Sequence, residues 1–486
     1  MLTGTAVASG GSTPAANTLM VESGSATTYN MMQAMDTLYN DAPGCNLIDI
    51  PAVPQQFDFG CPAAANTTPP PTMSGTYAPY PDFATSPGYT ENPANDVSVQ
   101  EPPYGSSNGI KQLETTSGTS SCTSTNPTAP LGMARSSRSV SSGDCKGLNF
   151  AAYAVDGVGW FHYTSVNGHP TPSASATNLS QALLIDAWNG TLQCWNDPVV
   201  AAGSGTPTFT YSTAGCKPIV LYSAQAGSGT FNSWQTYIGQ DPRTYLTTLN
   251  GTSFNIQKTD GTTGTEIYNS NDHVVLENED REIISVGDEA NALFFYSFGK
   301  FNVTCKVGSC GNIPGGTGTT TATLGQDDGV TASKTTILCG AGLQTTGCTG
   351  FFSPTRFVNN VYSNGSNPNV PQASFNVLNY VSEIGFICKP NTTDGSQSSA
   401  KQIIDPNTGV SYRKEIAAVI TSQGFLAIPF QKNEGTVPHS AYSILHPHVG
   451  DAGLDGEIAS VDTLGQKATK SSGYCLVFTS DNNTNS

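Results

Sequence analysis

Four short segments of the sequence combine serine or threonine with glycine or with a predicted helix start, and such residues can bind a small anion. Hydroxyl groups and the backbone N–H groups at helix N-termini donate hydrogen bonds from several directions without bulk, as a tetrahedral oxyanion requires. We therefore predict an oxyanion site built from these segments. Its candidate ligands are Thr27, Thr28, Ser106, Ser107, Ser136, Ser137, Arg138, Ser228, Gly229 and Thr230.

The Gly-Ser-Gly-Thr motif at 227–230 fits this chemistry best. Its glycines permit close approach of the backbone, and its two hydroxyls stand where a predicted helix begins. An ordinary helix cap with a glycine turn explains the motif equally well, and each of the other segments taken singly is more often a cap than a ligand loop. Arg138 could add a planar pair of donors, although Arg135 competes for that role and a surface arginine is the plain alternative.

The elements that would position these segments are those of an α/β protein. Apolar periodicity predicts a helix at 28–39, and a strand, a glycine–serine loop and a helix follow one another at 96–114 and at 218–238. Gly-, Pro- and Thr-rich insertions are expected at 46–96 and 312–346, and a mobile leader at 1–18. Further core segments are expected at Phe150–Val158, Leu179–Trp188, Ile283–Phe301 and Phe375–Cys388.

Composition narrows the class of partner. The 486 residues are enough for two lobes with insertions. Nineteen basic residues against thirty-six acidic ones give a net charge of −17, which argues against nucleic acid, because binding to a phosphate backbone needs clustered Lys and Arg. A small anion is still possible, since helix N-termini and oriented N–H and O–H dipoles bind it locally.

The twelve cysteines are even in number and lack the repeated C-x-x-C spacing of a metal site, which indicates disulfides in an oxidising compartment. We expect an extracellular, periplasmic or cell-surface protein without a membrane span; the first eighteen residues do not form an export signal. Pairing neighbours in order is the simplest prediction: Cys45–Cys61, Cys122–Cys145, Cys194–Cys216, Cys305–Cys310, Cys339–Cys348 and Cys388–Cys475.

The order and wording of several segments resemble the PstS-like phosphate-binding receptors of ABC importers. The loop 105–114 (GSSNGIKQLE) is similar to the family's GSSGGIKQ loop, and 226–239 (AGSGTFNSWQTYIG) is similar to its DGSGT-led helix. Matches run in family order from about 24 to 430, with perhaps half of the chain unmatched. The other matching segments are MARSSRSV at 133–140, YAVDGVGW at 153–160, LSQALLIDAWNGTLQCWNDP at 179–198 and YRKEIAAVITSQGFLAIP at 412–429.

The resemblance implies an α/β, two-lobed periplasmic-binding-protein fold (type II) with long loop insertions, joined by two or three crossover strands near 155 and 383. It places the first lobe at 19–155 and 381–430, the second at 156–380, and a C-terminal extension packing on the first lobe at 431–486. The implied ligand is phosphate or a similar oxyanion, held by Thr27 or Thr28, Ser106, Ser137, Ser228, Gly229 and Thr230. An ABC permease partner, a monomer and no cofactor are expected.

Two departures from the family pattern bear on selectivity. Ala224 stands where many members have an Arg, and Ser137 is followed by no Asp, the residue that accepts the proton of a protonated oxyanion. A surface or adhesive protein that keeps the scaffold with weakened or lost anion binding is therefore the main alternative. An enzyme is not expected, because no histidine stands beside a G-x-S-x-G elbow and His446-Pro447-His448 offers only a weak metal pair.

Overall fold

We analysed a computed structural model of the chain. It describes residues 20–35, 105–114, 131–304, 320–364, 412–428 and 470–480, apart from a few positions inside these ranges, together with short pieces at 73–74, 122, 408 and 410. The predicted leader, the insertion at 46–96 except for 73–74, the strand at 96–99 and the core segment Phe375–Cys388 lie outside the described residues.

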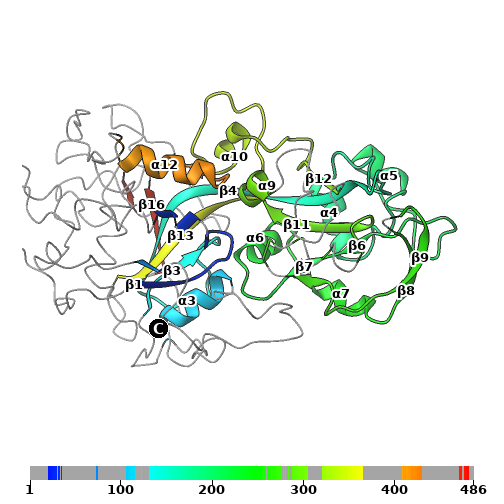
Figure 1. Ribbon diagram of the computed structural model, residues 1–486, viewed down its shortest axis with the longest axis horizontal. Helices are drawn as coiled ribbons and strands as arrows, with labels where there is room; N and C mark the ends of the chain where they lie inside the picture. Colours follow the sequence, from blue (N-terminus) through cyan, green and yellow to red (C-terminus); the bar gives the residue numbers. More distant parts are fainter. Residues whose placement is uncertain are drawn as a thin grey trace, which may run out of the picture.

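One long strand, β4 (Leu148–Val166), runs through both halves of the molecule. Its first half pairs with β13 as far as Gly157, and from Val158 onward it pairs with β11. Apolar side chains form two separate cores on either side of this change of partner. The protein is thus an α/β protein of two lobes lying end to end along β4 (Figure 1), which confirms the predicted fold class and a crossover near residue 155.

The first lobe is a mixed sheet in the order β15-β16-β4-β13-β3-β1-β2, with β14 also paired to β4. β1 is parallel to β3, and β13 is antiparallel to both β3 and β4. Its elements are β1 (Met20–Gly24), β2 (Met73–Ser74), α3 (Ser106–Glu114), β3 (Leu131–Ser136), α10 (Lys334–Gly340), β13 (Thr355–Ser363), α12 (Tyr412–Ser422), β14 (Leu426–Ala427), β15 (Lys470–Ser472) and β16 (Cys475–Thr479).

The second lobe is built around β11, which pairs with β4 on one side and with β6 on the other. Two small two-stranded sheets, β10 with β7 and β8 with β9, complete it. Its elements are β5 (His169–Pro170), α4 (Gln181–Trp188), α5 (Pro198–Ala202), β6 (Val220–Leu221), β7 (Ser223–Ala224), α6 (Gly229–Ile238), α7 (Thr244–Leu249), β8 (Ser253–Gln257), β9 (Thr263–Ile267), β10 (Val274–Val275), β11 (Ala292–Ser297), α9 (Phe298–Thr304) and β12 (Thr321–Leu324).

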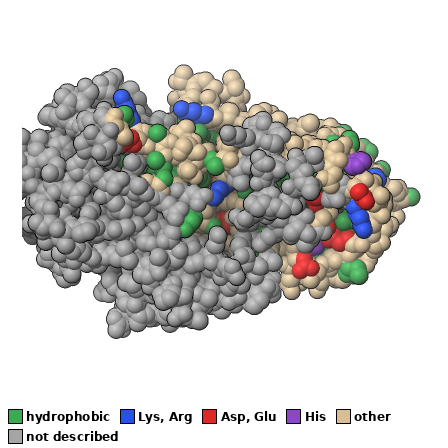
Figure 2. Space-filling model, in the orientation of Figure 1, with side chains coloured by type: hydrophobic (Ala, Val, Ile, Leu, Met, Phe, Trp, Pro, Cys, Tyr) green, Lys and Arg blue, Asp and Glu red, His purple; other side chains and the backbone are tan. Residues whose placement is uncertain are grey.

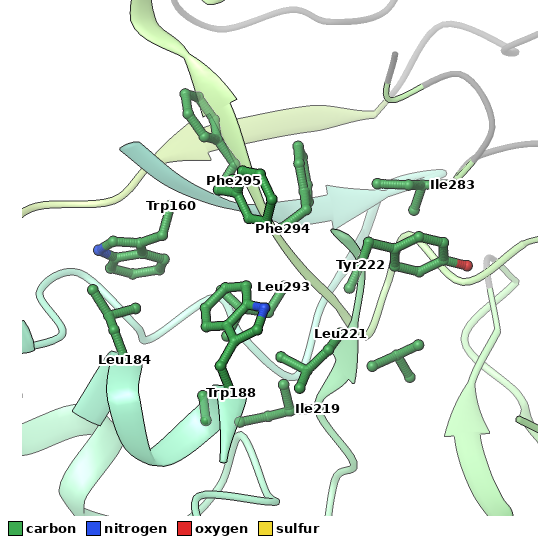
Figure 3. Close-up of a cluster of buried hydrophobic side chains, with 14 of the residues drawn as sticks. Trp160, Leu184, Trp188, Ile219, Leu221, Tyr222, Ile283, Leu293, Phe294 and Phe295 are labelled. Atoms are coloured by element: carbon green, nitrogen blue, oxygen red, sulfur yellow. The ribbon is translucent and has the colours of Figure 1, made fainter. Parts of the chain in front are cut away.

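Aromatic packing fixes α4 and α6 against β11. The rings of Trp188 and Trp234 meet edge to face with centroids 5.2 Å apart, and Trp234 stacks on Phe295 at 5.5 Å. Figure 3 shows Trp188 and Phe295 within this apolar cluster, with Trp160 of β4 beside them. Large aromatic side chains bury much apolar area, so the helix that carries the Gly-Ser-Gly-Thr motif has a firm position in the lobe.

Three predicted disulfides are present: Cys122–Cys145, Cys194–Cys216 and Cys339–Cys348. Cys45–Cys61, Cys305–Cys310 and Cys388–Cys475 involve positions outside the described residues. Each of the three observed bonds joins neighbours in the sequence and lies within one lobe, so none of them ties the lobes together.

Two sequence-based expectations about the later part of the chain need correction. β13 pairs with β3, so the chain re-enters the sheet of the first lobe at Thr355 rather than at 381. The segment 312–346 was expected to be an insertion, yet β12 pairs with β4 and α10 contributes Ile337 to the core of the first lobe. Glycine and threonine content hid these elements, because their apolar runs are short. β16 joins the first lobe by pairing with β4.

The described part of the face in Figure 2 carries few charges. Figure 2 shows mainly uncharged side chains and backbone on the described part of this face, with acidic groups in a few places on the second lobe. Among the described helices, none is both long and apolar enough to cross a membrane.

Candidate functional site

The four predicted segments meet between the lobes and bring five hydroxyl groups together. We call Ser25, Thr27, Ser106, Ser137 and Thr230 the hydroxyl cluster; all five are buried. The Ser137 hydroxyl lies 2.8 Å from that of Ser25, 3.3 Å from that of Ser106 and 3.5 Å from that of Thr27, and the Thr27 and Thr230 hydroxyls are 3.4 Å apart. Thr230 belongs to the second lobe and the other four to the first, so the cluster spans the junction between the lobes.

Two helix N-termini point into the cluster region. α3 begins at Ser106, and α6 begins at Gly229 with Ser228 as its N-cap. The backbone N–H of Ser107 donates to the carbonyl of Gly227 at 2.9 Å, so the two helix starts touch across the lobes. A Cβ on Gly229 would overlap the hydroxyls of Ser137 and Ser106, which explains why this position is glycine.

The carboxylate of Glu277 lies within the cluster. Its Oε1 accepts hydrogen bonds from the backbone N–H of Thr230 at 2.8 Å, from the Thr230 hydroxyl at 2.9 Å and from the Ser137 hydroxyl at 3.1 Å. Its Oε2 accepts from the Ser25 hydroxyl and from the Ala26 N–H, both at 3.2 Å. Donors predicted to surround an oxyanion therefore surround an anionic side chain of the protein itself.

Arg356 supplies the positive charge beside the cluster. One guanidinium nitrogen, Nη1, donates to the Thr230 hydroxyl at 2.9 Å and to the carbonyl of Ser137 at 3.0 Å. The Nε and Nη2 atoms donate to Oδ2 of Asp156 at 3.0 and 2.7 Å, and both side chains of this ion pair are fully buried. The ion pair with Asp156 on β4 thus fixes the guanidinium of Arg356 on β13 at the junction of the lobes.

The charge of Glu277 follows from these neighbours. Burial by itself favours the neutral acid and raises its pKa, but Arg356 and the hydrogen bonds from Thr230 and Thr27 outweigh burial and leave the pKa below the ordinary value. Glu277 is therefore a carboxylate at neutral pH, and the donors around it face a full negative charge.

Asn278 and Ser297 tie the cluster to the second lobe. The side-chain amide of Asn278 donates to the Thr27 hydroxyl at 2.7 Å, and its carbonyl oxygen accepts from the Ser297 N–H at 2.8 Å. The Ser297 hydroxyl in turn donates to Asp156 at 2.7 Å. A continuous chain of buried hydrogen bonds thus connects the cluster to the Arg356–Asp156 pair, and such networks fix side-chain positions when every member is satisfied.

Three of the other predicted residues use their hydroxyls locally. The Ser228 hydroxyl accepts from the Phe231 N–H at 3.0 Å as a helix cap, and the Thr28 hydroxyl is 3.5 Å from the carbonyl of Ser25. The Ser136 hydroxyl donates to the carbonyl of Arg138 at 2.8 Å. These three are buried beside the cluster but direct their hydroxyls to the backbone.

The two candidate arginines lie behind the cluster. Arg138 forms a two-pronged ion pair with Asp144 at 2.9 and 2.6 Å and donates to the Ser107 hydroxyl at 2.9 Å. Burial opposes its charge, but Asp144 more than compensates and raises its pKa. Arg135 donates to the carbonyl of Ser25 at 3.3 Å. Arg356, in contrast, donates to a hydroxyl group of the cluster, that of Thr230.

Sequence reasoning did not predict Ser25, Glu277, Asn278 or Arg356 as site residues. One signal was available, because Asp156 is the single charge in the apolar run Tyr153–Trp160. A buried carboxylate needs a cation, which points to an arginine elsewhere in the chain. Nothing in the sequence places Glu277 next to Ser137, which is 140 residues away.

A second polar cluster in the second lobe contains the side chains that a metal ion would need. Ligand atoms of Glu266, His273 and Asp288 all lie within 4.8 Å of one another. Nε2 of His273 is 2.9 Å from Glu266 and 3.4 Å from Asp288. Burial opposes protonation, but the hydrogen bonds to Asp288 and Glu266 prevail and raise the pKa of His273 to about 9. Burial raises the pKa of Glu266 to about 7, whereas burial of Asp288 is outweighed by hydrogen bonds, that with His273 first, which lower its pKa, so the imidazolium is paired mainly with Asp288.

Comparison with known proteins gives structural likenesses only. No family model matches the chain, and no curated protein matches it. Among solved structures it is similar to an ABC-type phosphate transport receptor from Vibrio cholerae (12% identity, TM-score 0.36), covering 84% of this chain and 99% of that one. PstS from Borrelia burgdorferi (14%, TM-score 0.32) and a possible phosphate-binding protein from Planctomyces limnophilus (11%, TM-score 0.33) are similar over 84% of this chain and 98% of theirs.

Proposed function

We propose that this chain is a PstS-like solute-binding protein, which captures an inorganic oxyanion, phosphate in the first place, between its two lobes. The observation that carries the proposal is the convergence of donors on one carboxylate. Hydroxyl and N–H groups of Ser25, Ala26, Ser137 and Thr230 come from segments far apart in the sequence and surround a single anionic group. An arrangement that holds a carboxylate with five hydrogen bonds is suited to an oxyanion.

The ligands we propose are the hydroxyl cluster, the N–H groups at the start of α6 and the fixed charge of Arg356. Burial strengthens each charge-assisted hydrogen bond to the anion, because the surroundings have a low dielectric constant. The other predicted residues, Thr28, Ser107, Ser136, Arg138 and Ser228, would shape the loops around the anion.

We propose capture without catalysis. A hydroxyl nucleophile usually depends on an adjacent general base, most often histidine. Among the described residues, the hydroxyl cluster is hydrogen-bonded to a carboxylate, an amide and a guanidinium, but to no imidazole.

The three observed disulfides support an oxidising location, so we propose an extracellular, periplasmic or cell-surface protein. A receptor of this kind would deliver its anion to an ABC permease, and we propose that it does so as a monomer without a cofactor.

Titration calorimetry with phosphate, sulfate, arsenate and molybdate tests the proposal. Because Glu277 lies among the donors, both the natural chain and a Glu277→Ala variant are titrated. Ser137→Ala and Thr230→Val should weaken binding by about 1 to 3 kcal/mol, because each removes a charge-assisted hydrogen bond. Thr236→Val on the exposed side of α6 is the matched control and should leave the affinity unchanged. Heat with none of the four anions, in either chain, would refute capture.

One observation favours the alternative, a surface or adhesive protein that keeps the scaffold without binding an anion. The Glu277 carboxylate already satisfies the donors, so the fold is complete without a guest. The same titrations decide between the two functions, since the alternative predicts no heat in the natural chain or the variant.

A further inference from the structure

Glu277 makes the contacts of a bound ligand rather than those of an ordinary buried carboxylate. It is 2% exposed, and its two oxygens accept five hydrogen bonds. Three of the donors, on Ser25, Ala26 and Ser137, belong to the first lobe, whereas Glu277 itself and Thr230 belong to the second. The carboxylate therefore belongs to the second lobe and accepts hydrogen bonds from loops of the first lobe.

A short, anchored segment brings Glu277 to this place. β10 ends at Val275, two residues before Glu277, and pairs with β7, which leads into the Gly-Ser-Gly-Thr loop. The next residue, Asn278, is fixed by hydrogen bonds to Thr27 and Ser297. The backbone on both sides of Glu277 is thus anchored at the site. The side chain can leave the cluster only by changing its rotamer or when the lobes move apart.

The charges do not permit a second anion beside Glu277. Arg356 is paired with Asp156 and also stabilises the charge of Glu277, so one guanidinium already faces two carboxylates and the site carries a net negative charge. A further anion within about 4 Å would be strongly repelled, because the effective dielectric constant of this buried site is far below that of water. An incoming oxyanion and the Glu277 carboxylate therefore exclude one another.

We propose that Glu277 is a tethered internal anion that closes the cleft in the absence of ligand, and that an external oxyanion binds by displacing it from the hydroxyl cluster. The closing role stands on the contacts alone, whereas the displacement rests on the proposed capture of an oxyanion. Displacement sets the class of ligand: a tetrahedral dianion offers more charge and more oxygens than a carboxylate, while a monocarboxylate such as acetate offers neither and cannot compete.

The size of the effect follows from mass action. When a binding-competent state is populated for only 1 to 10% of the time, the apparent affinity falls by about 10- to 100-fold. Removal of the carboxylate should therefore tighten oxyanion binding by about 10- to 100-fold.

The experiment combines Glu277→Ala with two further variants. Glu277→Gln keeps the size of the side chain without its charge and should give a smaller gain in affinity, and it serves if the alanine variant does not fold. Asp272→Ala removes one negative charge from an exposed position of the same lobe and controls for net charge. Each chain is measured without ligand by small-angle scattering, and then by calorimetry with phosphate, sulfate and acetate.

The outcomes separate the tether from the capture. Larger dimensions of the ligand-free Glu277→Ala chain, with tighter phosphate or sulfate binding than in the natural chain and no acetate binding to the natural chain, support both. Larger dimensions without binding of any anion support the tether and overturn capture. Equal affinity in the natural chain and the variant, or loss of binding in the variant, overturns the tether and leaves capture standing. Unchanged dimensions without any binding overturn both.

Discussion

The hydroxyl of Ser137 donates to the carboxylate of Glu277 at 3.1 Å, across the buried junction between the two lobes, and the two residues are 140 positions apart in the sequence. Ser137 follows β3 in the first lobe, and Glu277 follows β10 in the second. The site is therefore closed by the protein's own side chains, and any change that separates these two residues should open the cleft.

Gly229→Ala should prevent full closure of the lobes. The added Cβ would overlap the hydroxyls of Ser106 and Ser137, so the start of α6 must move away from the first lobe. We expect larger dimensions in small-angle scattering and loss of anion binding. Gly143→Ala is the control, because its Cβ would meet only the Ser141 hydroxyl at an ordinary 3.8 Å. Identical scattering curves for the two variants would contradict the close approach.

Arg356→Met should be among the most destabilising single changes. It leaves Asp156 buried without its cation, which typically costs about 3 to 5 kcal/mol in the free energy of unfolding. Urea denaturation measures the loss, and an added Asp156→Asn should recover part of it by removing the unpaired charge.

The matched control for Arg356 is Arg243→Met. The Arg243–Asp241 pair is partly exposed, with 27% and 34% of the side chains accessible, so its loss should cost about 1 kcal/mol or less. Equal destabilisation by the two arginine changes would mean that the buried Arg356–Asp156 pair contributes no more to stability than the partly exposed Arg243–Asp241 pair.

Removal of the Cys194–Cys216 disulfide by a double serine variant should lower the free energy of unfolding by about 3 kcal/mol. The bond closes a loop between positions 22 apart and restricts the unfolded chain. The Cys339–Cys348 disulfide closes a shorter loop, with a separation of 9. Its removal should therefore lower the free energy of unfolding by somewhat less. Denaturation without reductant compares the three chains, and a negligible loss in both variants would argue against these bonds.

Glu114→Gln should flatten the dependence of stability on pH. Burial, followed by the charge of Asp144, raises the pKa of Glu114 from 4.5 to about 8, so the folded state binds this proton more tightly than the unfolded state. Stability linked to the proton is complete below pH 4.5 and is lost as the pH rises towards 8, by about 1 kcal/mol per pH unit.

The glutamine variant stays neutral and retains the acceptor for the Cys145 N–H, which contacts Oε1 at 2.7 Å. Urea denaturation of both chains at several values between pH 4.5 and 8 measures the two slopes. Parallel slopes would show that Glu114 does not carry this proton in the folded state.

The sequence by itself determined several of the elements and the local chemistry of the hydroxyl segments. Leu183, Leu184 and Ala187 recur at helical spacing and form one buried face of α4, and Phe150–Val158, predicted as a core segment, is buried within β4. The hydroxyl segments could be recognised because glycine, serine and a following helix have a defined local geometry. Three of the predicted disulfides were correct, because a short stretch of chain between two cysteines keeps them close enough to form a bond.

Only the tertiary structure decided which charges meet. Arg138 was the candidate cation in the sequence, but Asp144 engages it from six positions away, whereas Arg356 reaches the hydroxyl cluster through strand pairing with β4. Glu277 carries no local sign of its role, because its five donors come from segments in two lobes. Long-range contacts of this kind depend on strand register and lobe closure, and no pattern within a short window of sequence contains them.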